Sequence, residues 1–473
     1  MQSTQGWEYT KIVSTIGPAS DTEEKLEALI LAGVNVARLN TKHGSTQWHA
    51  ERIDRIRKAA NKVGKPIAIL LDLQGPEIRI DLLNKQPLQL KEGDQVHFVS
   101  EFTDVLKNQI RIPQNVIESL GVGNKISIDD GTCEMEITEK LADHLGARTL
   151  SSCTCGDRKT MNTPGIIIDM PSLIPADLEK LDILKDHPVD FIALSFVRNK
   201  VDIAILRDEM KKRGITADLV AKIENQSAID HLNEIIEHSD AVMVARGDLG
   251  VEAPMEELAY LQKEIIKRCC AYGKPVITAT QMLKSMVENA RPTRAEVCDV
   301  ANAVFDGTDA VMLSEETAMG KFPMETVTIM RKIVNYNETK VIVPGIEEES
   351  KSMTSAVTKM AMSLVEDKIA SVDKILVLTE TGFTAQQMTR HRPHVPLIVV
   401  TDRHDTVLRS TLLFGALPIF HEFPVGKIMD LSVLINRLKD ERVVQKGQKL
   451  LVVHGTIYKT PGFTNAVAII DVE

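Results

Sequence analysis

The sequence lacks any long uninterrupted hydrophobic segment. No apolar run approaches the roughly 18 residues that a membrane-spanning helix requires, and the opening residues MQSTQGWEYTKIV lack the apolar core of a signal peptide. The 473 residues are 43% hydrophobic and 26% charged, as in ordinary globular proteins. We therefore expect no membrane contact and a cytoplasmic location.

Cysteine is also scarce. In a chain of this size, six scattered cysteines are too few for a disulfide framework. Cys153 and Cys155 lack a second pair at zinc-ligand spacing, so a zinc site is not predicted. Ordinary reduced thiols are expected. The six are Cys133, Cys153, Cys155, Cys269, Cys270 and Cys298.

The chain has fewer positively charged residues than negatively charged ones. There are 56 Lys and Arg residues against 66 Asp and Glu, which gives a formal net charge of -10. This balance argues against a broad nucleic-acid footprint. If the substrate is an anion, the positive field that binds it must be local.

What the sequence does contain is a regular alternation of short apolar runs and helical patterns. Nearly continuous apolar runs with polar residues at their C-terminal ends are typical of parallel strands covered on both faces. Eight such units predict an α/β fold with a (β/α)8 TIM barrel, whose chemistry collects at the C-terminal strand ends. The runs are KIVSTI, VNVARLN, IAILLDL, FIALSFV, LVAKIE, AVMVARGD, PVITAT and AVMLSE, starting at residues 11, 34, 67, 191, 219, 241, 275 and 310.

The first helix has readable ends. Ser20 and Glu23 have capping-box spacing, and Gly33 is the predicted stop. One face of this helix is predicted to carry Leu26, Leu29 and Ile30.

Two parts of the chain interrupt the alternation of strands and helices. After the third strand, segments such as LQLKEGDQVHFVS alternate as strands do, which predicts a small inserted β-barrel lid domain at 80–165 and a delayed helix in IPADLEKLDILKDH. The barrel is then expected at 1–79 and 166–339. Beyond the predicted polar linker VPGIEEESK, four strands with interleaved helices predict a separate open α/β domain at 340–473.

Polar residues end the predicted barrel strands and should face one pocket. Glu224 and Asp248 offer two carboxylates, enough for Mg2+ when water and substrate oxygens complete the shell. The alternative is a buried ion pair between Lys222 and either acid. Glycines around Asp248 let the backbone approach an anion. The strand-end residues are Thr15, Arg38, Asn40, Asp72, Lys222, Glu224, Asp248, Thr280 and Ser314.

Two arginines extend this rim of positive charge. Arg38 and Arg79 suit bidentate contact with phosphate or carboxylate, although arginines at strand ends are often structural. A cation-rich rim around a two-carboxylate metal site indicates a small phosphorylated acid as substrate.

At this level of detail the chain resembles the pyruvate kinase family. The resemblance runs in order from about Thr10 to the C-terminal GFTN. It implies a barrel with an inserted β-domain and a C-terminal effector and oligomerisation domain, transfer of a phosphoryl group from phosphoenolpyruvate to ADP to give pyruvate and ATP, and a homotetramer. The matching motifs include TKIVSTIGPAS, NVARLN, GPEIR, AKIENQ, MVARGDLGVE, ITATQML and RPTRAEVCDVANAVFDGTDAVMLS.

The resemblance also implies roles for individual residues. Lys222 would stabilise the transferring phosphoryl group and the enolate, Glu224 and Asp248 would hold Mg2+ or Mn2+, and Arg38 would contact the phosphoryl group. The substrate carboxylate would be framed by Gly247, Asp248 and Thr280. A proton relay would use Thr280 and Ser314, and nucleotide contacts would come from Asn40, His43, Arg79 and Lys159.

The chain departs from the family pattern at the monovalent-ion site. Asn40 and Asp72 remain, but the family's Ser and Thr ligands are replaced by Lys42 and Leu73. Our hypothesis is that the Lys42 ammonium occupies or borders the K+ site and replaces the ion, so that K+ is not required. Glu77 points the other way, because K+-independent members commonly carry a lysine there. The alternative is a Lys42 that extends to solvent and leaves an impaired site.

A second family feature is the loop TETGFTA in the C-terminal domain, which resembles an effector-phosphate loop. Phe383 replaces the usual arginine. A sugar-phosphate or nucleotide effector and a turn without a ligand both fit this sequence. The candidate contacts are Thr379, Thr381, Gly382 and Thr384.

Two other functions compete with this one. The first is a different Mg2+-dependent barrel enzyme acting on phosphoenolpyruvate or pyruvate, such as a lyase or aldolase. An inserted domain carrying Lys159 argues against it, because an aldolase has no use for a nucleotide lid. The second is a catalytically silent paralogue that binds metabolites and regulates a partner, which the retained Lys222, Glu224, Asp248 and Thr280 argue against.

Overall fold

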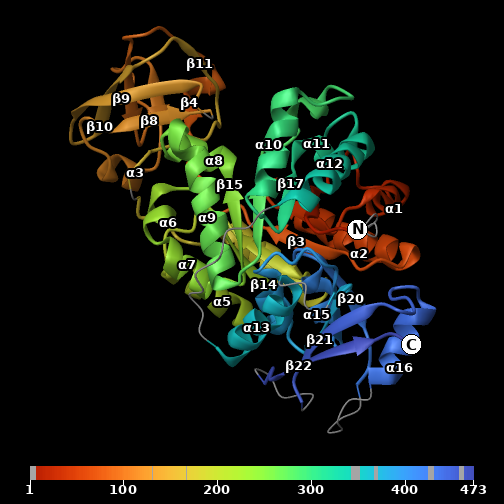
Figure 1. Cartoon of the computed structure of the whole chain (residues 1–473). Helices are drawn as coiled ribbons and strands as arrows, with labels where there is room; N and C mark the ends of the chain where they lie inside the picture. Colours follow the sequence, from red (N-terminus) through yellow and green to blue (C-terminus); the bar gives the residue numbers. More distant parts are fainter. Residues whose placement is uncertain are drawn as a thin grey trace.

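The computed structural model describes residues 7–129, 131–166, 168–341, 352–366, 371–423, 431–456 and 463–473. Eight parallel strands close into a barrel, in the order β1-β17-β16-β15-β14-β13-β3-β2. Figure 1 shows the barrel in the middle of the molecule. All eight predicted strands form, so the predicted TIM barrel is confirmed. They are β1 (Lys11–Thr15), β2 (Val36–Asn40), β3 (Ala68–Asp72), β13 (Phe191–Leu194), β14 (Asp218–Ile223), β15 (Ala241–Ala245), β16 (Val276–Ala279) and β17 (Ala310–Leu313).

The barrel strands are buried on both faces, which explains their continuous apolar runs. Side chains such as Val13, Leu70 and Phe191 point inward and fill the barrel, whereas Ile12 and Leu71 belong to the layer between strands and helices. The interior is thus a packed core, and the chemistry must lie at its rim.

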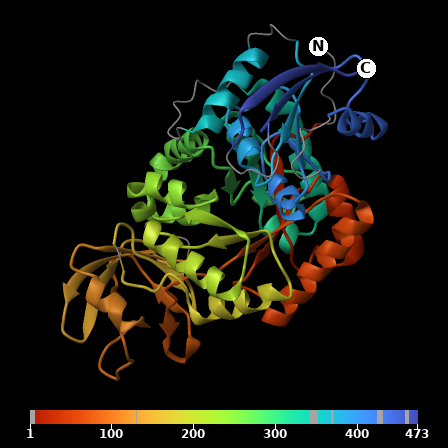
Figure 2. The ribbon, with the colours of Figure 1, turned by 90° about the horizontal axis from the view of Figure 1, so that it is seen from below.

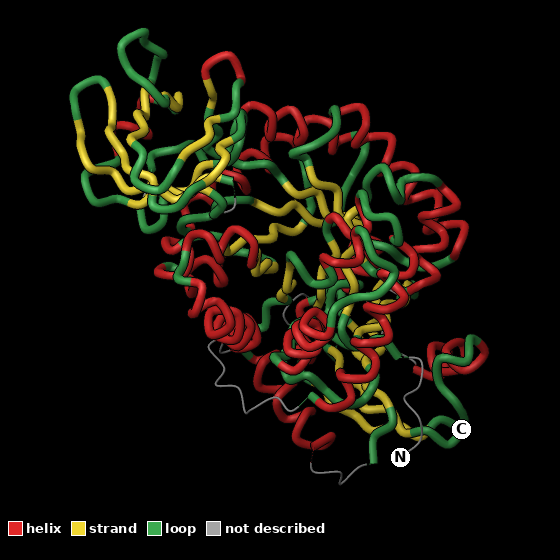
Figure 3. The backbone as a smooth tube through the Cα atoms, turned by 90° about the horizontal axis from the view of Figure 1, so that it is seen from above, coloured by secondary structure: helices red, strands yellow, loops and turns green. Residues whose placement is uncertain are grey.

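Helices surround the strands, as Figure 3 shows from above. Among the described residues, no helix is long and apolar enough to cross a membrane. The main barrel helices are α1 (Glu23–Ala32), α2 (Thr46–Val63), α4 (Pro175–Asp182), α5 (Lys200–Arg213), α7 (Leu232–His238), α9 (Leu258–Tyr272), α10 (Arg294–Phe305) and α12 (Pro323–Asn337). Shorter ones follow strand ends: α6 (Gln226–Asp230), α8 (Arg246–Glu252) and α11 (Glu315–Ala318).

The predicted start of α1 was wrong by two residues. Thr22 caps the helix by accepting from the Lys25 amide, while the Ser20 hydroxyl accepts from the Gly17 amide in the preceding turn. Both residue types can cap, and the tertiary turn decides between them. The predicted stop is confirmed, because Gly33 takes a left-handed conformation with φ 113°. The predicted apolar face is buried through Leu26, Leu29 and Ile30.

The inserted segment forms two sheets beside the barrel. A seven-stranded sheet has the order β12-β8-β9-β10-β6-β7-β4, and β11 pairs with β5 in a separate two-stranded sheet. The range 80–165 stays a prediction for this domain. Its elements are β4 (Asp81–Leu82), β5 (Leu88–Leu90), β6 (Gln95–Val99), β7 (Gln109–Arg111), α3 (Gln114–Ser119), β8 (Lys125–Ile128), β9 (Cys133–Lys140), β10 (His144–Thr149), β11 (Cys153–Cys155) and β12 (Met161–Asn162).

One expectation about cysteine was wrong. Cys133 and Cys153 form a disulfide, with their Cα atoms 5.5 Å apart. Strand packing brings together two residues whose separation in sequence gave no sign of it. Cys155 and three other cysteines are free thiols, as expected; those three are Cys269, Cys270 and Cys298.

The C-terminal segment forms a five-stranded sheet in the order β20-β19-β18-β21-β22. The four predicted strands form, and the fifth, β22, was missed; it pairs antiparallel to β21. The predicted linker at 343–351 lies outside the described residues. The elements are α13 (Met353–Glu366), β18 (Lys374–Leu378), α14 (Phe383–Thr389), β19 (Leu397–Thr401), α15 (His404–Ser410), β20 (Ala416–Phe420), α16 (Leu431–Asp440), β21 (Lys449–His454) and β22 (Ala466–Asp471).

The inserted domain and the C-terminal domain lie on opposite sides of the barrel (Figures 1 and 2). The C-terminal domain is joined to the barrel by a buried ion pair. Arg392 donates to Asp309 at 2.6 Å, and both side chains are only 1% exposed. Asp309 also accepts from the Phe414 amide, and Leu412 packs into the barrel's inner core. The domain interface is therefore continuous with the core of the barrel.

Candidate active site

A cavity of about 70 Å³ lies at the C-terminal ends of the barrel strands. It collects most of the strand-end residues that the sequence predicted for one pocket. Three apolar side chains and one alanine complete the wall. The lining residues are Arg38, Asn40, Lys42, Asp72, Leu73, Lys222, Met243, Ala245, Asp248, Thr280 and Met312.

Lys222 on β14 is held by acceptors at the ends of three barrel strands: its own, the adjacent β13, and β3 beyond it. Its ammonium lies 2.7 Å from the Glu224 carboxylate and 3.3 Å from that of Asp72, and it donates to the Ser195 hydroxyl at 2.7 Å. Burial alone would lower the pKa of Lys222, but the two carboxylates outweigh burial and raise it above its ordinary value. Lys222 is therefore a fixed cation at the wall of the cavity.

The two candidate metal ligands sit differently. Glu224 is 1% exposed and also accepts from the Phe196 amide at 2.7 Å, whereas Asp248 is partly exposed. Burial raises the pKa of Glu224, Lys222 lowers it, and the charge of Asp248 raises it again. Asp248 was predicted at a strand end but lies in the first turn of α8, because the chain turns helical directly after Ala245.

These carboxylates suit a divalent cation only with help from other ligands. Among the described residues, no group of three or more His, Cys, Asp or Glu side chains is placed to hold a metal ion. Mg2+ commonly keeps water and substrate oxygens beside one or two protein carboxylates. Glu224 and Asp248 supply the two carboxylates that such a site uses. The alternative from the sequence, a buried ion pair of Lys222 with an acid, is present in the structure through Glu224.

Arg38 uses part of its hydrogen-bonding capacity on other side chains of the protein. Its guanidinium holds one oxygen of Asp72 from both Nε and Nη2, at 2.7 and 2.6 Å, and Nη1 donates to the Thr15 hydroxyl. Burial would raise the pKa of Asp72, but Lys222 and Arg38 together hold it below its ordinary value. The other oxygen of Asp72 has no hydrogen bond but lies 3.3 Å from the Lys222 ammonium, so both oxygens of this carboxylate face a cation of the protein.

Thr280 ends β16 in a conformation rare for a β-branched residue. Its φ is 71°, and its hydroxyl accepts from the Gly247 amide at 2.8 Å and donates to the Ala279 carbonyl at 2.6 Å. A backbone outlier at a rim of polar groups marks a position that the surroundings enforce. The Thr280 hydroxyl and the start of α8 are thereby fixed together.

Two supporting residues were missed by the sequence analysis. Arg246 donates to the carbonyls of Ala279 and Thr280, which fixes the end of β16. Ser195 accepts from Lys222 and donates to the Leu73 carbonyl at 2.7 Å. Arg246 lies beside Gly247 in the glycine-flanked motif, which was a usable signal; Ser195 had none.

Lys42 points toward the hinge of the inserted domain. Its ammonium lies 3.3 Å from Glu77 and 5.8 Å from the centroid of the Phe196 ring. The Lys42 side chain is 23% exposed, so it does not extend freely into solvent. Burial would raise the pKa of Glu77, but Lys42 and the donors Thr160 and Arg79, both at 2.7 Å, lower it.

The predicted nucleotide contacts are dispersed. Asn40 lines the cavity, and its side chain accepts from the Lys42 amide. His43 is exposed, Arg79 is paired with Glu77, and Lys159 pairs with Asp129 at 2.9 Å within the inserted domain. None of these last three lines the cavity in this conformation.

The remaining predicted residues also lie outside the cavity lining. The Gly247 amide donates to the hydroxyl of Thr280, which lines the cavity. Ser314 precedes α11, and its amide donates to Glu316 at 2.7 Å. In the loop before α14, the Thr379 hydroxyl accepts from the Gly382 amide and the Thr384 hydroxyl contacts that of Thr464. Thr381 is exposed.

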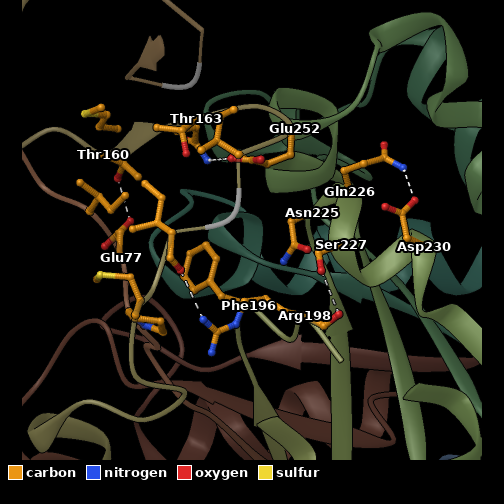
Figure 4. A pocket seen from close by; sticks show the side chains of 18 residues that line it. Glu77, Thr160, Thr163, Phe196, Arg198, Asn225, Gln226, Ser227, Asp230 and Glu252 are labelled. Atoms are coloured by element: carbon orange, nitrogen blue, oxygen red, sulfur yellow. Dashed lines mark hydrogen bonds between the residues drawn. The ribbon is translucent and has the colours of Figure 1, made fainter. Parts of the chain in front are cut away.

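A larger cavity, of about 170 Å³, lies at the hinge between the inserted domain and the barrel (Figure 4). Asn162 donates to Glu252 across it at 2.9 Å, and Thr160 donates to Glu77. Lys222 and Asp248 line the smaller cavity and not this one, and Glu224 is among the lining residues of neither.

Comparisons with known proteins agree with this geometry. The family model "Pyruvate kinase, barrel domain" matches residues 7–327, and "Pyruvate kinase, alpha/beta domain" matches residues 355–470. Pyruvate kinases of Bacillus licheniformis and Dictyostelium discoideum are each 39% identical, over 97% and 98% of this chain and 80% and 94% of those proteins.

A solved structure shows the same architecture. The crystal structure of a pyruvate kinase from Cryptosporidium parvum superposes with a TM-score of 0.90 at 32% identity, covering 98% of this chain and 96% of that one. Sequence and structure agree over nearly the whole length, and the chain therefore belongs to the pyruvate kinase family, whose members transfer the phosphoryl group of phosphoenolpyruvate to ADP.

Proposed function

We propose that the cavity at the barrel rim is the centre where this pyruvate kinase transfers its phosphoryl group, with Lys222 as the central catalytic residue. The observation that carries the proposal is the position of the Lys222 ammonium between Glu224 and Asp72 at the cavity wall. A fixed cation there stabilises negative charge on the transferring group without reorganisation. Arg38 adds a second cation for the phosphoryl oxygens.

The carboxylate end of the substrate is assigned to the start of α8. The backbone of Gly247 and Asp248 and the hydroxyl of Thr280 lie together there, joined by the hydrogen bond between Gly247 and Thr280. Thr280, with Ser314 at the next strand end, is assigned to the proton supply for the enolate. The enolate formed when the phosphoryl group leaves takes up one proton to give pyruvate.

A divalent metal belongs to the family's reaction, and we assign it to Glu224 and Asp248. Bound there, Mg2+ or Mn2+ would supply positive charge beside the substrate oxygens. Glu224 is anchored by the Phe196 amide, so its carboxylate is oriented before any ligand arrives. Asn40, His43, Arg79 and Lys159 are assigned to the nucleotide, and Lys159 would reach it only when the inserted domain closes over the cavity.

We assign the role of the monovalent ion to a side chain of the protein, that of Lys42. Lys42 borders the monovalent-ion site from the Glu77 side, near Asn40 and Asp72, and supplies the positive charge that K+ would bring. K+ is then dispensable. We further propose a homotetramer in the cytoplasm, with residues 1–79 and 166–339 as catalytic domain, 80–165 as lid and 340–473 as the domain that carries any effector phosphate.

The decisive experiment is a coupled assay for ADP-dependent pyruvate formation by the full chain, with Mg2+ and with or without K+. We expect turnover in both buffers. Lys222→Met should reduce phosphoryl transfer by at least about a thousandfold while the fold stays intact. Lys274→Met is the matched control, because Lys274 caps carbonyls at the opposite end of the barrel. Absence of turnover in both buffers would favour the silent paralogue.

A further inference from the structure

The Cys133–Cys153 disulfide links two sheets that share no strand pairing. Cys133 begins β9 in the seven-stranded sheet, and Cys153 begins β11, which pairs only with β5. Among the described residues this is the only covalent link between those sheets apart from the main chain itself. Without it, β11 is attached to the rest of the domain by the connecting chain, its short ladder with β5, the hydrogen bond from the Leu150 amide to the Glu134 carbonyl and side-chain packing.

An ion pair lies close in sequence to both cysteines of the disulfide. Asp129 precedes Cys133 by four residues, and Lys159 follows Cys153 by six. These two residues form an ion pair at 2.9 Å. The Asp129 amide also donates to the Thr160 carbonyl at 3.0 Å. The disulfide therefore holds the start of the segment that leads from β11 to Lys159. The end of that segment is held by the ion pair and by main-chain hydrogen bonds of Arg158 and Lys159 with Ile80.

We infer that Cys133 and Cys153 form a reversible redox site that sets the order of the Lys159 segment, and through it the binding of ADP. The inference rests on the proposed nucleotide contact of Lys159. With the disulfide formed, β11 is fixed to β9 and the segment is presented in one position. With two thiols, β11 is released and Lys159 is less well placed.

The two sulfur atoms differ in access, which fixes the order of the exchange. Cys133 is fully buried, whereas Cys153 is partly exposed. A thiolate of a dithiol reductant attacks the Cys153 sulfur and the Cys133 thiolate leaves and takes up a proton. The second thiol of the reductant then attacks the mixed disulfide, releasing Cys153 as a thiol and closing the reductant's own disulfide. Two electrons and two protons pass to the protein.

The reverse reaction needs a low-molecular-weight disulfide such as oxidised glutathione. The Cys153 thiolate breaks its S–S bond and releases one thiol, and the Cys133 thiolate then displaces the second thiol from Cys153. Cys155 is two residues away but fully buried, and burial raises the pKa of its thiol to about 11. It is therefore protonated at neutral pH and does not compete in the exchange.

The test compares the full-length protein equilibrated with oxidised glutathione and with a dithiol. Differential alkylation and mass spectrometry read the disulfide, and initial rates give KM for each substrate. We expect a linked 133–153 peptide pair in the oxidised form. On reduction, KM for ADP should rise by about threefold to tenfold while KM for phosphoenolpyruvate stays unchanged. Cys153→Ser should show the reduced behaviour in both buffers, and Cys298→Ser should respond like the wild type.

Lys159→Ala separates this inference from the proposed function. If Lys159→Ala raises KM for ADP but the redox state does not, the redox site is refuted and the nucleotide contact stands. If Lys159→Ala leaves KM for ADP unchanged, the proposed nucleotide contact is refuted. Hydrogen exchange of residues 153–160 then tests whether the disulfide orders this segment. Slower exchange in the oxidised form supports that role, and equal exchange in both forms refutes it. Failure of oxidised glutathione to form the link overturns the inference directly.

Discussion

The Lys42 ammonium lies 3.3 Å from the Glu77 carboxylate, beside the cavity at the barrel rim. The same carboxylate accepts from Thr160, at the end of the inserted segment, and from Arg79. A positively charged side chain at this cavity is thereby linked to the chain that joins the barrel to the inserted segment.

The first prediction concerns monovalent ions. In buffer free of K+ and Na+, we expect wild-type activity to rise less than about twofold on adding K+, because a second cation about 4 Å from the ammonium is repelled by about 4 kcal/mol at an effective dielectric of 20. The double variant Lys42→Ser, Leu73→Thr should become K+-dependent. Lys58→Ser, an exposed lysine on α2 paired with Glu23, is the control. Strong K+ stimulation of the wild type would contradict the assignment.

The second prediction concerns the metal ligand Glu224. Glu224→Gln loses the charge and keeps an acceptor for only one of its two donors, Lys222 and the Phe196 amide, so the Mg2+ concentration for half-maximal activity should rise at least about tenfold. Because burial raises the pKa of Glu224, protons compete with the metal, and in the wild type this concentration should fall as pH rises. Glu252→Gln changes a partly exposed carboxyl that accepts from Asn162, and it should leave metal affinity unchanged. Equal metal dependence of both variants would remove Glu224 from the site.

The third prediction separates the hydroxyl of Thr280 from its shape. Thr280→Val preserves the branched side chain but leaves the Gly247 amide without its acceptor and removes the proton carrier. We expect kcat to fall by about a hundredfold or more. Thr280→Ser keeps the hydroxyl and should remain within about tenfold of the wild type. Steady-state kinetics of both variants, with circular dichroism to verify folding, checks this. A valine variant with normal kcat would refute the role.

The fourth prediction concerns stability and pH at the opposite end of the barrel. Asp218 pairs with Arg409 of the C-terminal domain at 3.1 Å, yet burial outweighs the arginine and raises the pKa of Asp218 from 3.8 to about 7. The folded state then binds this proton more tightly than the unfolded state. The free energy of unfolding should fall as pH rises from about 4 to about 7, by at most about 4 kcal/mol.

Asp218→Asn should flatten that part of the stability profile, measured by denaturant unfolding at several pH values. Asp208→Asn removes an exposed carboxyl on α5 that pairs with Lys212, and it should retain the wild-type slope. If Asp218→Asn and the wild type lose stability in parallel between pH 4 and 7, Asp218 does not titrate in this range. Part of the side chain, 20%, is exposed, so the measured change should lie below the upper limit.

The fold was predictable because its main signals are local. Each barrel strand carries its own apolar run, and the strand ends converge because parallel strands share one polarity. The start of α1 was misjudged because Ser20 and Thr22 are both good caps, and the turn through Gly17 chooses between them. The strand β22 was missed because it adds to an edge rather than continuing the alternation of strand and helix.

Most residues that line the cavity at the barrel rim were predictable from the strand ends, but their contacts were not. Lys222 and Glu224 share a strand face, so their pairing follows from spacing. Ser195 contacts Lys222 from a different strand, and no pattern in the sequence reports that contact. The disulfide between Cys133 and Cys153 arises in the same way, from the packing of two sheets.

The buried pair of Asp309 and Arg392 has a consequence for dissecting this protein by gene truncation. Removing the C-terminal segment would take away the counter-charge of the Asp309 carboxylate and the Phe414 amide that donates to it. It would also uncover the inner barrel surface that Leu412 fills. A barrel expressed alone should therefore aggregate or be degraded. The barrel is expected to fold stably only together with the C-terminal segment.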